Sequence, residues 1–229
     1  MKTIGLIGGM SWESSAEYYR LINMEVKRQL GGLHSATCIL YSVDFQEIEH
    51  YQAKGNWERA GAVLGEAAHS LEKAGADFIV ICTNTMHKVV DLIEAKINIP
   101  ILHIADATAS QIQKAKLKTI GLLGTKYTME QAFYKERIGN QGIEVIVPGE
   151  EERNGVNRII YEELCLGIIE QPSKEYYLKV IQKLIEEGAC GIILGCTEIG
   201  LLIKQEDVQV PIFDTTVIHA IAAVEQAIK

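Results

Sequence analysis

The chain has 229 residues, about one and a half times a domain length of roughly 150 residues, and we expect two small domains rather than one large one. Hydrophobic residues make up 48% and charged residues 23% of the sequence, which excludes a disordered or collagen-like chain. The formal net charge is −8, and Lys and Arg never occur in runs longer than two. Nucleic acid is therefore not an expected partner, since phosphate binding depends on clustered basic side chains.

The apolar stretches are short. Two of the longest, residues 78–81 and 192–194, fall far below the ~20 residues that a membrane-spanning helix needs, so no membrane span is expected. The sequence from Met1 runs directly into a strand-like segment without the pattern of a signal peptide, which predicts a cytoplasmic protein. A reducing compartment would keep the five cysteines as thiols, and they contain no CxxC pair. They are Cys38, Cys82, Cys165, Cys190 and Cys196.

Short β-branched runs alternate with helical patterns along the chain, which predicts βαβ units around parallel sheets. The first strand is expected at residues 3–7, followed by a glycine turn and a helix that Ser11 caps and Gly31-Gly32 ends. Helices fill most of the gaps between the later strands, and a last helix is expected at residues 215–227. Those strands are expected at residues 36–41, 77–82, 100–103, 119–123, 144–147, 191–195 and 211–213.

The sequence also repeats itself. Residues 4–9 recur at 120–125, Gly75-Ala76 recurs 113 residues later, and 99–101 recurs at 210–212. Three matches in one order at nearly one spacing indicate an internal duplication. We therefore predict an α/β fold of two pseudo-symmetric halves, each a small parallel sheet flanked by helices. The first half is expected at residues 1–98, with 209–229 returning to it, and the second at 99–208.

Two small polar segments directly follow predicted strands, at residues 82–87 and 195–199. Ligands of parallel α/β sheets bind at the carboxyl ends of strands, so we expect one site in the cleft between the halves. The offset of 113 residues makes Thr83, not Cys82, the counterpart of Cys196. Because side chains alternate along a strand, Cys82 is expected to point away from the site.

Residues 4–10, 83–87 and 195–198 together resemble the aspartate/glutamate racemase superfamily along the whole chain. The resemblance implies a cofactor-independent enzyme in which two thiols flank the α-carbon of an amino acid. Thr83 stands where that family has its first catalytic Cys. By resemblance, Cys196 is then the thiol base on the L face, with Thr83 opposite.

Each candidate catalytic residue also has a structural interpretation. Cys196 could be a buried structural thiol, although a helix N-terminus would lower its pKa and favour catalysis. Glu198 could move the thiol proton or could serve as a helix-start residue, and its carboxylate would raise the thiol pKa. Thr83 could deliver a proton to a carbanion or bind the substrate carboxylate, and both roles stay open.

Polar groups near the two segments are suited to hold a carboxylate: Asn84, Thr85 and Thr197, with the backbone amides of Gly9 and Met10. Their alternative is ordinary turn and capping chemistry. Thr125, the counterpart of Gly9, is a weaker candidate.

By resemblance, Gln52 stands at or near the position of an Arg that clamps a distal carboxylate, and Cys165 at the position of a Lys. In residues 44–56 the only cation is Lys54. Losing both charged contacts would widen the range of substrates beyond aspartate and glutamate.

The remaining signals favour structural roles. The six histidines lack metal-ligand spacing, so no metal is expected. The first glycine turn is neither a GxGxxG nor a Walker motif, and no nucleotide cofactor is expected. His87 lies in the family motif, but we expect it to be a helix-start residue satisfied by backbone.

We therefore predict racemisation of amino acids, aspartate and glutamate or a broader range, without pyridoxal phosphate or another cofactor. Two alternatives stay open. One is a single-thiol decarboxylase or isomerase of small dicarboxylic acids, and the other is a non-catalytic amino-acid binding protein. The only expected partners are the small amino-acid substrate and, by resemblance, a second copy in a homodimer.

Overall fold

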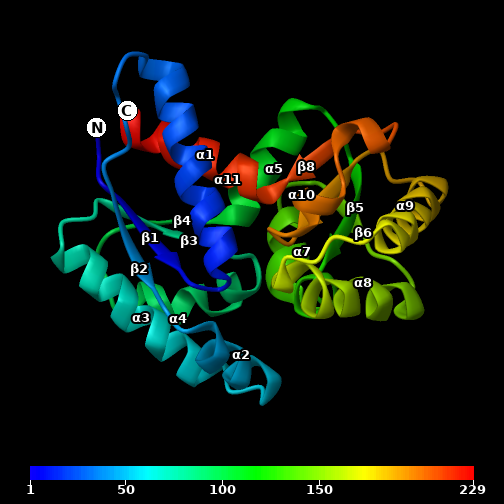
Figure 1. Cartoon of the computed structure of the whole chain (residues 1–229), viewed down its shortest axis with the longest axis horizontal. Coiled ribbons are helices and arrows are strands. Elements are labelled where there is room, and N and C mark those ends of the chain that lie inside the picture. Colours follow the sequence, from blue (N-terminus) through cyan, green and yellow to red (C-terminus); the bar gives the residue numbers. More distant parts are fainter. The chain divides into compact units, whose positions relative to one another are not determined.

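A computed structural model describes all residues, Met1–Lys229, and shows strands alternating with helices throughout (Figure 1). All eight expected strands are present. The chain begins with β1 (Ile4–Gly8), α1 (Trp12–Leu30), β2 (Cys38–Ser42), α2 (Phe45–Ala53), α3 (Trp57–Lys73), β3 (Phe78–Ile81), a 3₁₀ helix (Thr85–Val89), α4 (Val90–Glu94) and β4 (Ile101–Leu102).

The second part follows the same alternation. It contains α5 (Ile104–Lys114), β5 (Thr119–Gly124), α6 (Lys126–Glu130), α7 (Ala132–Gly139), β6 (Glu144–Ile146), α8 (Glu150–Glu162), a 3₁₀ helix (Leu164–Leu166), α9 (Gln171–Glu186), β7 (Ile192–Gly195), α10 (Ile199–Leu202), a 3₁₀ helix (Gln205–Asp207), β8 (Ile212–Asp214) and α11 (Thr215–Ile228). None of these helices is both long and apolar enough to cross a lipid bilayer.

The strands form two separate four-stranded sheets, in the orders β2-β1-β3-β4 and β6-β5-β7-β8. Every ladder in both sheets is parallel. This confirms the predicted fold class of two small parallel sheets flanked by helices. The two sheets also share one strand order, which is the arrangement that a duplicated sequence would produce.

The chain forms two compact units, one of residues 1–104 and 219–229 and the other of residues 105–218. Both boundaries lie later than the expected positions near 98 and 208. The reason is strand pairing: β4 joins the first sheet through Ile79 and Ile101, and β8 joins the second through Ile192 and Ile212. A two-residue strand is too short for its sequence to show which sheet it joins.

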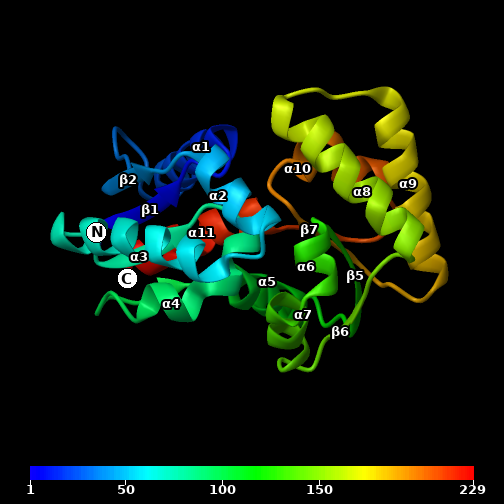
Figure 2. The same ribbon diagram turned by 90° about the horizontal axis from the view of Figure 1, so that it is seen from below.

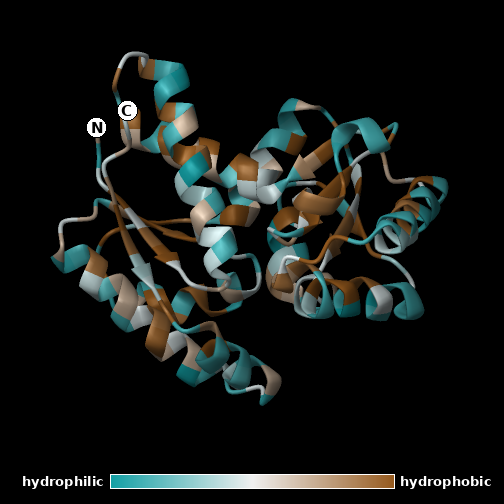
Figure 3. Cartoon of the chain, in the orientation of Figure 1, coloured by the Kyte–Doolittle hydropathy of each residue, from teal (hydrophilic) through white to brown (hydrophobic).

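Helices cover both faces of the first sheet (Figure 1). On one face α1 and α11 pack on Leu6, Phe78 and Val80, and Ala223 of α11 is fully buried there. On the other face α3 packs on Ile7, Ile79 and Ile81. The strand residues are accordingly hydrophobic, whereas polar residues occupy the outer sides of the helices (Figure 3). A strand covered on both faces reads as a continuous apolar run rather than an alternating one.

The ends of α1 follow the sequence signals. Ser11 caps the helix, since its side chain accepts a hydrogen bond from the backbone N–H of Ser14 at 3.2 Å. Gly31 ends it with a positive φ of 72°. Both features were expected: Ser11 fixes where the turn after β1 passes into the helix, and Gly31 fixes where the helix ends.

In the second unit, helices pack in pairs beside the sheet (Figure 2). Helices α5 and α7 are joined by the ion pair of Asp106 with Arg137, at 2.7 Å. Helices α8 and α9 are joined by the Tyr177 hydroxyl, which donates to the Val156 carbonyl at 3.2 Å. In this unit a short segment joins the carboxyl end of β5 to α6, and another joins the carboxyl end of β7 to α10.

Candidate active site

Thr83 and Cys196 hold equivalent positions in the two sheets. In the first sheet Ile7 of β1 is opposite Ile81 of β3, and Thr83 follows two residues later. In the second sheet Leu123 of β5 is opposite Leu194 of β7, and Cys196 follows two residues after Leu194. The ladder register thus gives the same correspondence as the sequence repeat.

Cys82 lies in the hydrophobic core of the first unit and not with the polar strand-end residues. It is fully buried among Ile4, Leu6 and Val80, and burial raises its pKa. This confirms that Cys82 points away from the strand-end segment. It is an inert thiol, since thiol reactivity requires the thiolate.

The backbone of Thr83 is held from both sides. Its N–H donates to the Ile81 carbonyl at 2.9 Å, and its own carbonyl accepts a hydrogen bond from His87 Nδ1 at 2.8 Å. Neither bond uses the hydroxyl of this half-buried residue. The side chain is therefore presented by a backbone that is itself fixed.

The other candidates of the first unit lie beside this segment. Asn84 and Thr85 are buried at the start of the 3₁₀ helix. Gln52 of α2 is also buried, and its Nε2 contacts Met86 Sδ at 3.0 Å. Met10 belongs to the same apolar cluster as Met86. The fold thus brings two residues that are distant in sequence, Met10 and Gln52, beside the segment that holds Asn84 and Thr85.

One expected contact is not supported. The Gly9 amide was expected to bind a carboxylate, but it already donates to Ser15 Oγ at 2.7 Å. Gly9 has a φ of 90°, and a Cβ there would collide with the Val43 backbone. The structural demand for glycine at this turn is therefore clear, and its amide is committed to holding the turn on α1.

In the second unit, the Glu198 carboxylate binds both of its polar neighbours. Its Oε2 accepts hydrogen bonds from Cys196 Sγ at 3.0 Å and from Thr197 Oγ1 at 2.7 Å. Glu198 is buried and precedes α10, yet its side chain makes no capping bond. Glu198 thus stands at the start of α10, but its carboxylate does not cap the helix and binds the thiol instead.

The expectation of a lowered Cys196 pKa is also wrong for this state of the protein. Cys196 is half-buried, and the desolvation of its thiol raises its pKa well above the usual value, while the negative charge of Glu198 raises it further. Cys165 adds to the same effect. Helix α10 spans only residues 199–202, and a dipole of one short turn does not offset these causes. The resting residue is a thiol, not a thiolate.

Two weaker candidates have other roles or settings. Thr125 Oγ1 accepts a hydrogen bond from the Thr128 N–H at 3.3 Å and caps α6. Cys165 lies in the 3₁₀ helix of residues 164–166, and its charge interaction with Cys196 shows that it belongs to the same region of the second unit. Lys54 is exposed just after α2.

Three of the six histidines converge in the first unit. The ring centroid of His87 lies 4.5 Å from that of His103 and 5.7 Å from that of His219, and all three side chains are buried. The three positions are far apart in sequence, so no spacing rule would have grouped them. The only available signal was the place of His87 in the polar segment after β3.

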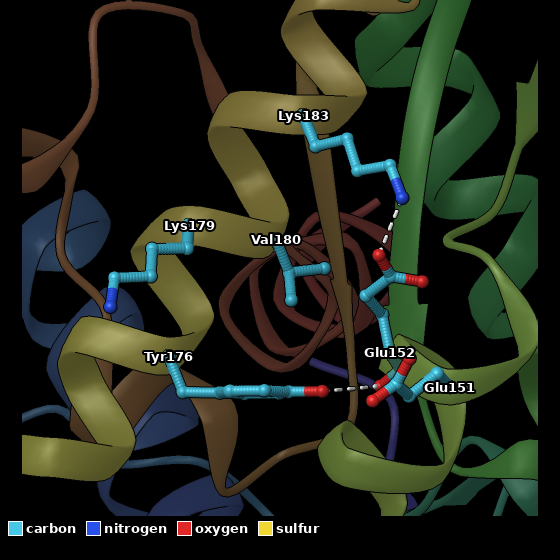
Figure 4. Close-up of a pocket in the computed structure, with 6 residues that line it drawn as sticks. All are labelled: Glu151, Glu152, Tyr176, Lys179, Val180 and Lys183. Carbon is cyan, nitrogen blue, oxygen red and sulfur yellow. Dashed lines mark hydrogen bonds and ion pairs between the residues drawn. The ribbon is translucent and has the colours of Figure 1, made fainter.

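A surface groove between α8 and α9 contains none of the candidate residues. Figure 4 shows its lining, where Lys183 forms an ion pair with Glu152 at 2.5 Å and the Tyr176 hydroxyl points to the Glu152 carbonyl. The ion pair raises the pKa of Lys183 and lowers that of Glu152. This ion pair joins α9 to α8 across the groove. The residues that line it are Glu151, Glu152, Tyr176, Lys179, Val180 and Lys183.

The chain is similar to a known protein family and to several of its members. The sequence profile of the Asp/Glu/hydantoin racemase family matches residues 7–223. The broad specificity amino-acid racemase RacX of Bacillus subtilis (strain 168) is 30% identical over 155 residues, which are 66% of this chain and 65% of that protein. The chain thus matches slightly less than two thirds of that relative's length.

Two crystal structures are also similar. A candidate Asp/Glu racemase from Yersinia pestis is 61% identical with a TM-score of 0.94, and each chain is covered over 100%. An aspartate racemase homologue from Pyrococcus horikoshii OT3 is 41% identical with a TM-score of 0.87, again over 100% of both chains.

The chain has two parallel sheets with the same strand order, and a short polar segment follows one strand of each, β3 and β7. This is the two-unit α/β fold of the amino-acid racemases. The chain belongs to the Asp/Glu/hydantoin racemase family.

Proposed function

We propose that this protein racemises amino acids without pyridoxal phosphate, with Cys196 taking the α-proton of the L-enantiomer and Thr83 serving the opposite face. The observation that carries the proposal is the equivalent placement of these two residues, each two positions beyond paired strand residues of sheets with the same order. The family and the relatives support racemase chemistry in general. They do not favour the decarboxylase or the binding-protein alternative.

The bond changes are simple. The Cys196 thiol passes its proton to the Glu198 carboxylate, to which it is hydrogen-bonded at 3.0 Å, and the thiolate then takes the α-proton of the L-amino acid. The α-C–H bond breaks, an S–H bond forms, and negative charge develops on the substrate carboxylate. The Thr83 O–H delivers a proton to the other face, water reprotonates the Thr83 oxygen, and the proton held by Glu198 neutralises the hydroxide that this leaves. Atoms and charges balance after one turnover.

The raised pKa of the half-buried thiol fits this sequence of steps. A thiol with a raised pKa is a strong base once it has lost its proton, and a strong base is needed for a weakly acidic α-carbon. The cost is a small thiolate fraction in the resting enzyme. Glu198 is already in position to accept the proton, since the thiol is hydrogen-bonded to its carboxylate at 3.0 Å.

Substrate binding is proposed for the residues that surround Thr83. The substrate carboxylate would be bound by Asn84, Thr85 and the backbone amide of Met10, and by Thr197 of the second unit. Gln52, fixed against Met86 at 3.0 Å, would contact the side chain of the substrate. An uncharged amide accepts or donates hydrogen bonds, so we propose acidic and uncharged polar amino acids as the substrate class.

Deuterium exchange tests the proposal. The protein would be incubated with single L-amino acids in deuterated water, with chiral separation and mass spectrometry of the products. We expect D-product carrying one α-deuterium, undiminished by hydroxylamine, which captures pyridoxal phosphate. The Cys190→Ser variant, which changes an exposed thiol, should behave like the wild type. Absence of exchange with every amino acid would overturn the proposal.

A further inference from the structure

His87 is a buried histidine whose two ring nitrogens both bind backbone groups. Its Nδ1 lies 2.8 Å from the Thr83 carbonyl, and its Nε2 lies 3.3 Å from the backbone N–H of Ile104. A carbonyl only accepts and an N–H only donates, so Nδ1 carries the proton and Nε2 accepts. The two contacts select one neutral tautomer.

The surroundings of His87 keep it in that neutral form. It is enclosed by the rings of His103 and His219, and burial together with these neighbours lowers its pKa well below the usual value. His219 is fixed in turn, because its Nε2 donates to the Leu102 carbonyl at 2.8 Å and its Nδ1 accepts from the Tyr18 hydroxyl at 2.9 Å. The imidazole of His87 is a hydrogen-bonding link and not a proton-transfer group.

The link acts on the peptide that follows Thr83. The strand ladder ends at Ile81, and the carbonyl of Cys82 is held by Ser14 Oγ at 2.9 Å. The next carbonyl, that of Thr83, is held by His87. Its orientation determines where the Thr83 backbone turns out of the strand, and so where the hydroxyl points.

The second nitrogen of His87 ties this turn to α5. Ile104 is the first residue of α5, and N–H groups in a first helical turn have no partner within the helix. His87 Nε2 supplies that partner. The same side chain therefore fixes both the turn after β3 and the start of the helix at which the first unit ends.

We propose that His87 is a positioning residue for Thr83: by binding the Thr83 carbonyl it holds the hydroxyl in the orientation that reprotonates the substrate on the face opposite Cys196. The inference rests on the proposed racemisation. It assigns His87 no contact with substrate. It predicts that loss of the Nδ1 bond impairs inversion and spares the proton exchange that Cys196 alone performs.

Two variants separate the two bonds of His87. In His87→Asn the side-chain amide occupies the place of Nδ1 and can still donate to Thr83, whereas in His87→Gln it occupies the place of Nε2 and can only serve Ile104. Exchange of the L-substrate α-proton in deuterated water and formation of D-product would be measured for both. We expect His87→Gln to lose about tenfold or more in D-product formation with exchange within about twofold, and His87→Asn to keep most inversion.

Equal losses of exchange and inversion in both variants would show a merely structural role and overturn the inference, as would full inversion by His87→Gln. Thermal unfolding of each variant would show whether the fold is retained. If the variants do not fold, ¹⁵N NMR of the wild type decides: we expect an Nδ1–H tautomer of His87 that does not titrate between pH 5 and 8. An Nε2–H tautomer or an ordinary titration would overturn it. If the wild type exchanges no amino acid, the proposed function fails and the tautomer measurement still tests the contact.

Discussion

The thiol of Cys196 donates a hydrogen bond of 3.0 Å to Glu198 Oε2, two residues further along the chain. The same carboxylate accepts from Thr197, so the three consecutive side chains form one hydrogen-bonded group. Burial and this negative charge both raise the thiol pKa. The Cys196 sulfur is therefore protonated in the resting protein, and Glu198 is the acceptor for its proton.

Glu198→Gln should lower the Cys196 pKa, because it removes a charge that disfavours the thiolate while keeping the side-chain shape. The rate of Cys196 alkylation by iodoacetamide near pH 7.5, followed by mass spectrometry of the modified peptide, should rise about three- to tenfold. Glu206→Gln changes an exposed carboxylate and should leave that rate unchanged. A slower alkylation in Glu198→Gln would show that the carboxylate stabilises the thiolate.

The stability of the protein should fall in mild acid because of its buried neutral histidines. His219 is fully buried, and its pKa is lowered from 6.5 to about 4. The unfolded chain then binds more protons than the folded one, so the free energy of unfolding is largest above about pH 6.5 and decreases as the pH falls toward 4. His219 alone accounts for about 3 kcal/mol over this range.

Urea unfolding between pH 7.5 and 4 measures this dependence. His219→Gln removes the ionisable ring, so its stability should be lower at pH 7.5 but should change less with pH than that of the wild type. An identical pH slope in the two proteins would mean that His219 does not stay neutral in the fold.

Gly9→Ala should destabilise the protein more than an ordinary substitution at a positive φ. A Cβ at Gly9 would lie 2.6 Å from the Val43 backbone nitrogen, and backbone cannot move aside cheaply. Gly55 has a φ of 67° with open space around it and provides the matched control in the same unit. We expect about 1 kcal/mol for Gly55→Ala and about 2–4 kcal/mol for Gly9→Ala in chemical denaturation. Equal costs would contradict the collision.

Much of the fold could be predicted because its signals are local. Apolar runs bounded by glycine and proline located all eight strands, and the repeat offset paired Thr83 with Cys196 as the ladder register does. Three features depend on tertiary contacts and could not be predicted. The pairing of two-residue β4 moved the unit boundary, the Glu198 carboxylate turned back onto the thiol, and His87 met two distant histidines.

The proposed roles predict different kinetics from the two enantiomers. A thiolate starts from L, whereas a Thr83 hydroxyl, a far weaker base, would have to start from D, so kcat from D should be at least about tenfold lower. Mirror symmetry fixes the equilibrium constant near one, and KM must therefore change with kcat in the same proportion. Initial rates by chiral chromatography test this. Thr83→Cys should raise kcat from D, and equal wild-type kcat values would contradict the assignment.

The most direct test of the central claim is the exchange of the α-proton of an L-amino acid in deuterated water, compared between Cys196→Ser and Thr83→Val. The account predicts that Cys196→Ser loses exchange by about a thousandfold or more because its base is gone, whereas Thr83→Val retains exchange and loses inversion. Exchange that persists in Cys196→Ser, or disappears in Thr83→Val, would contradict the assignment of Cys196 as the base on the L face.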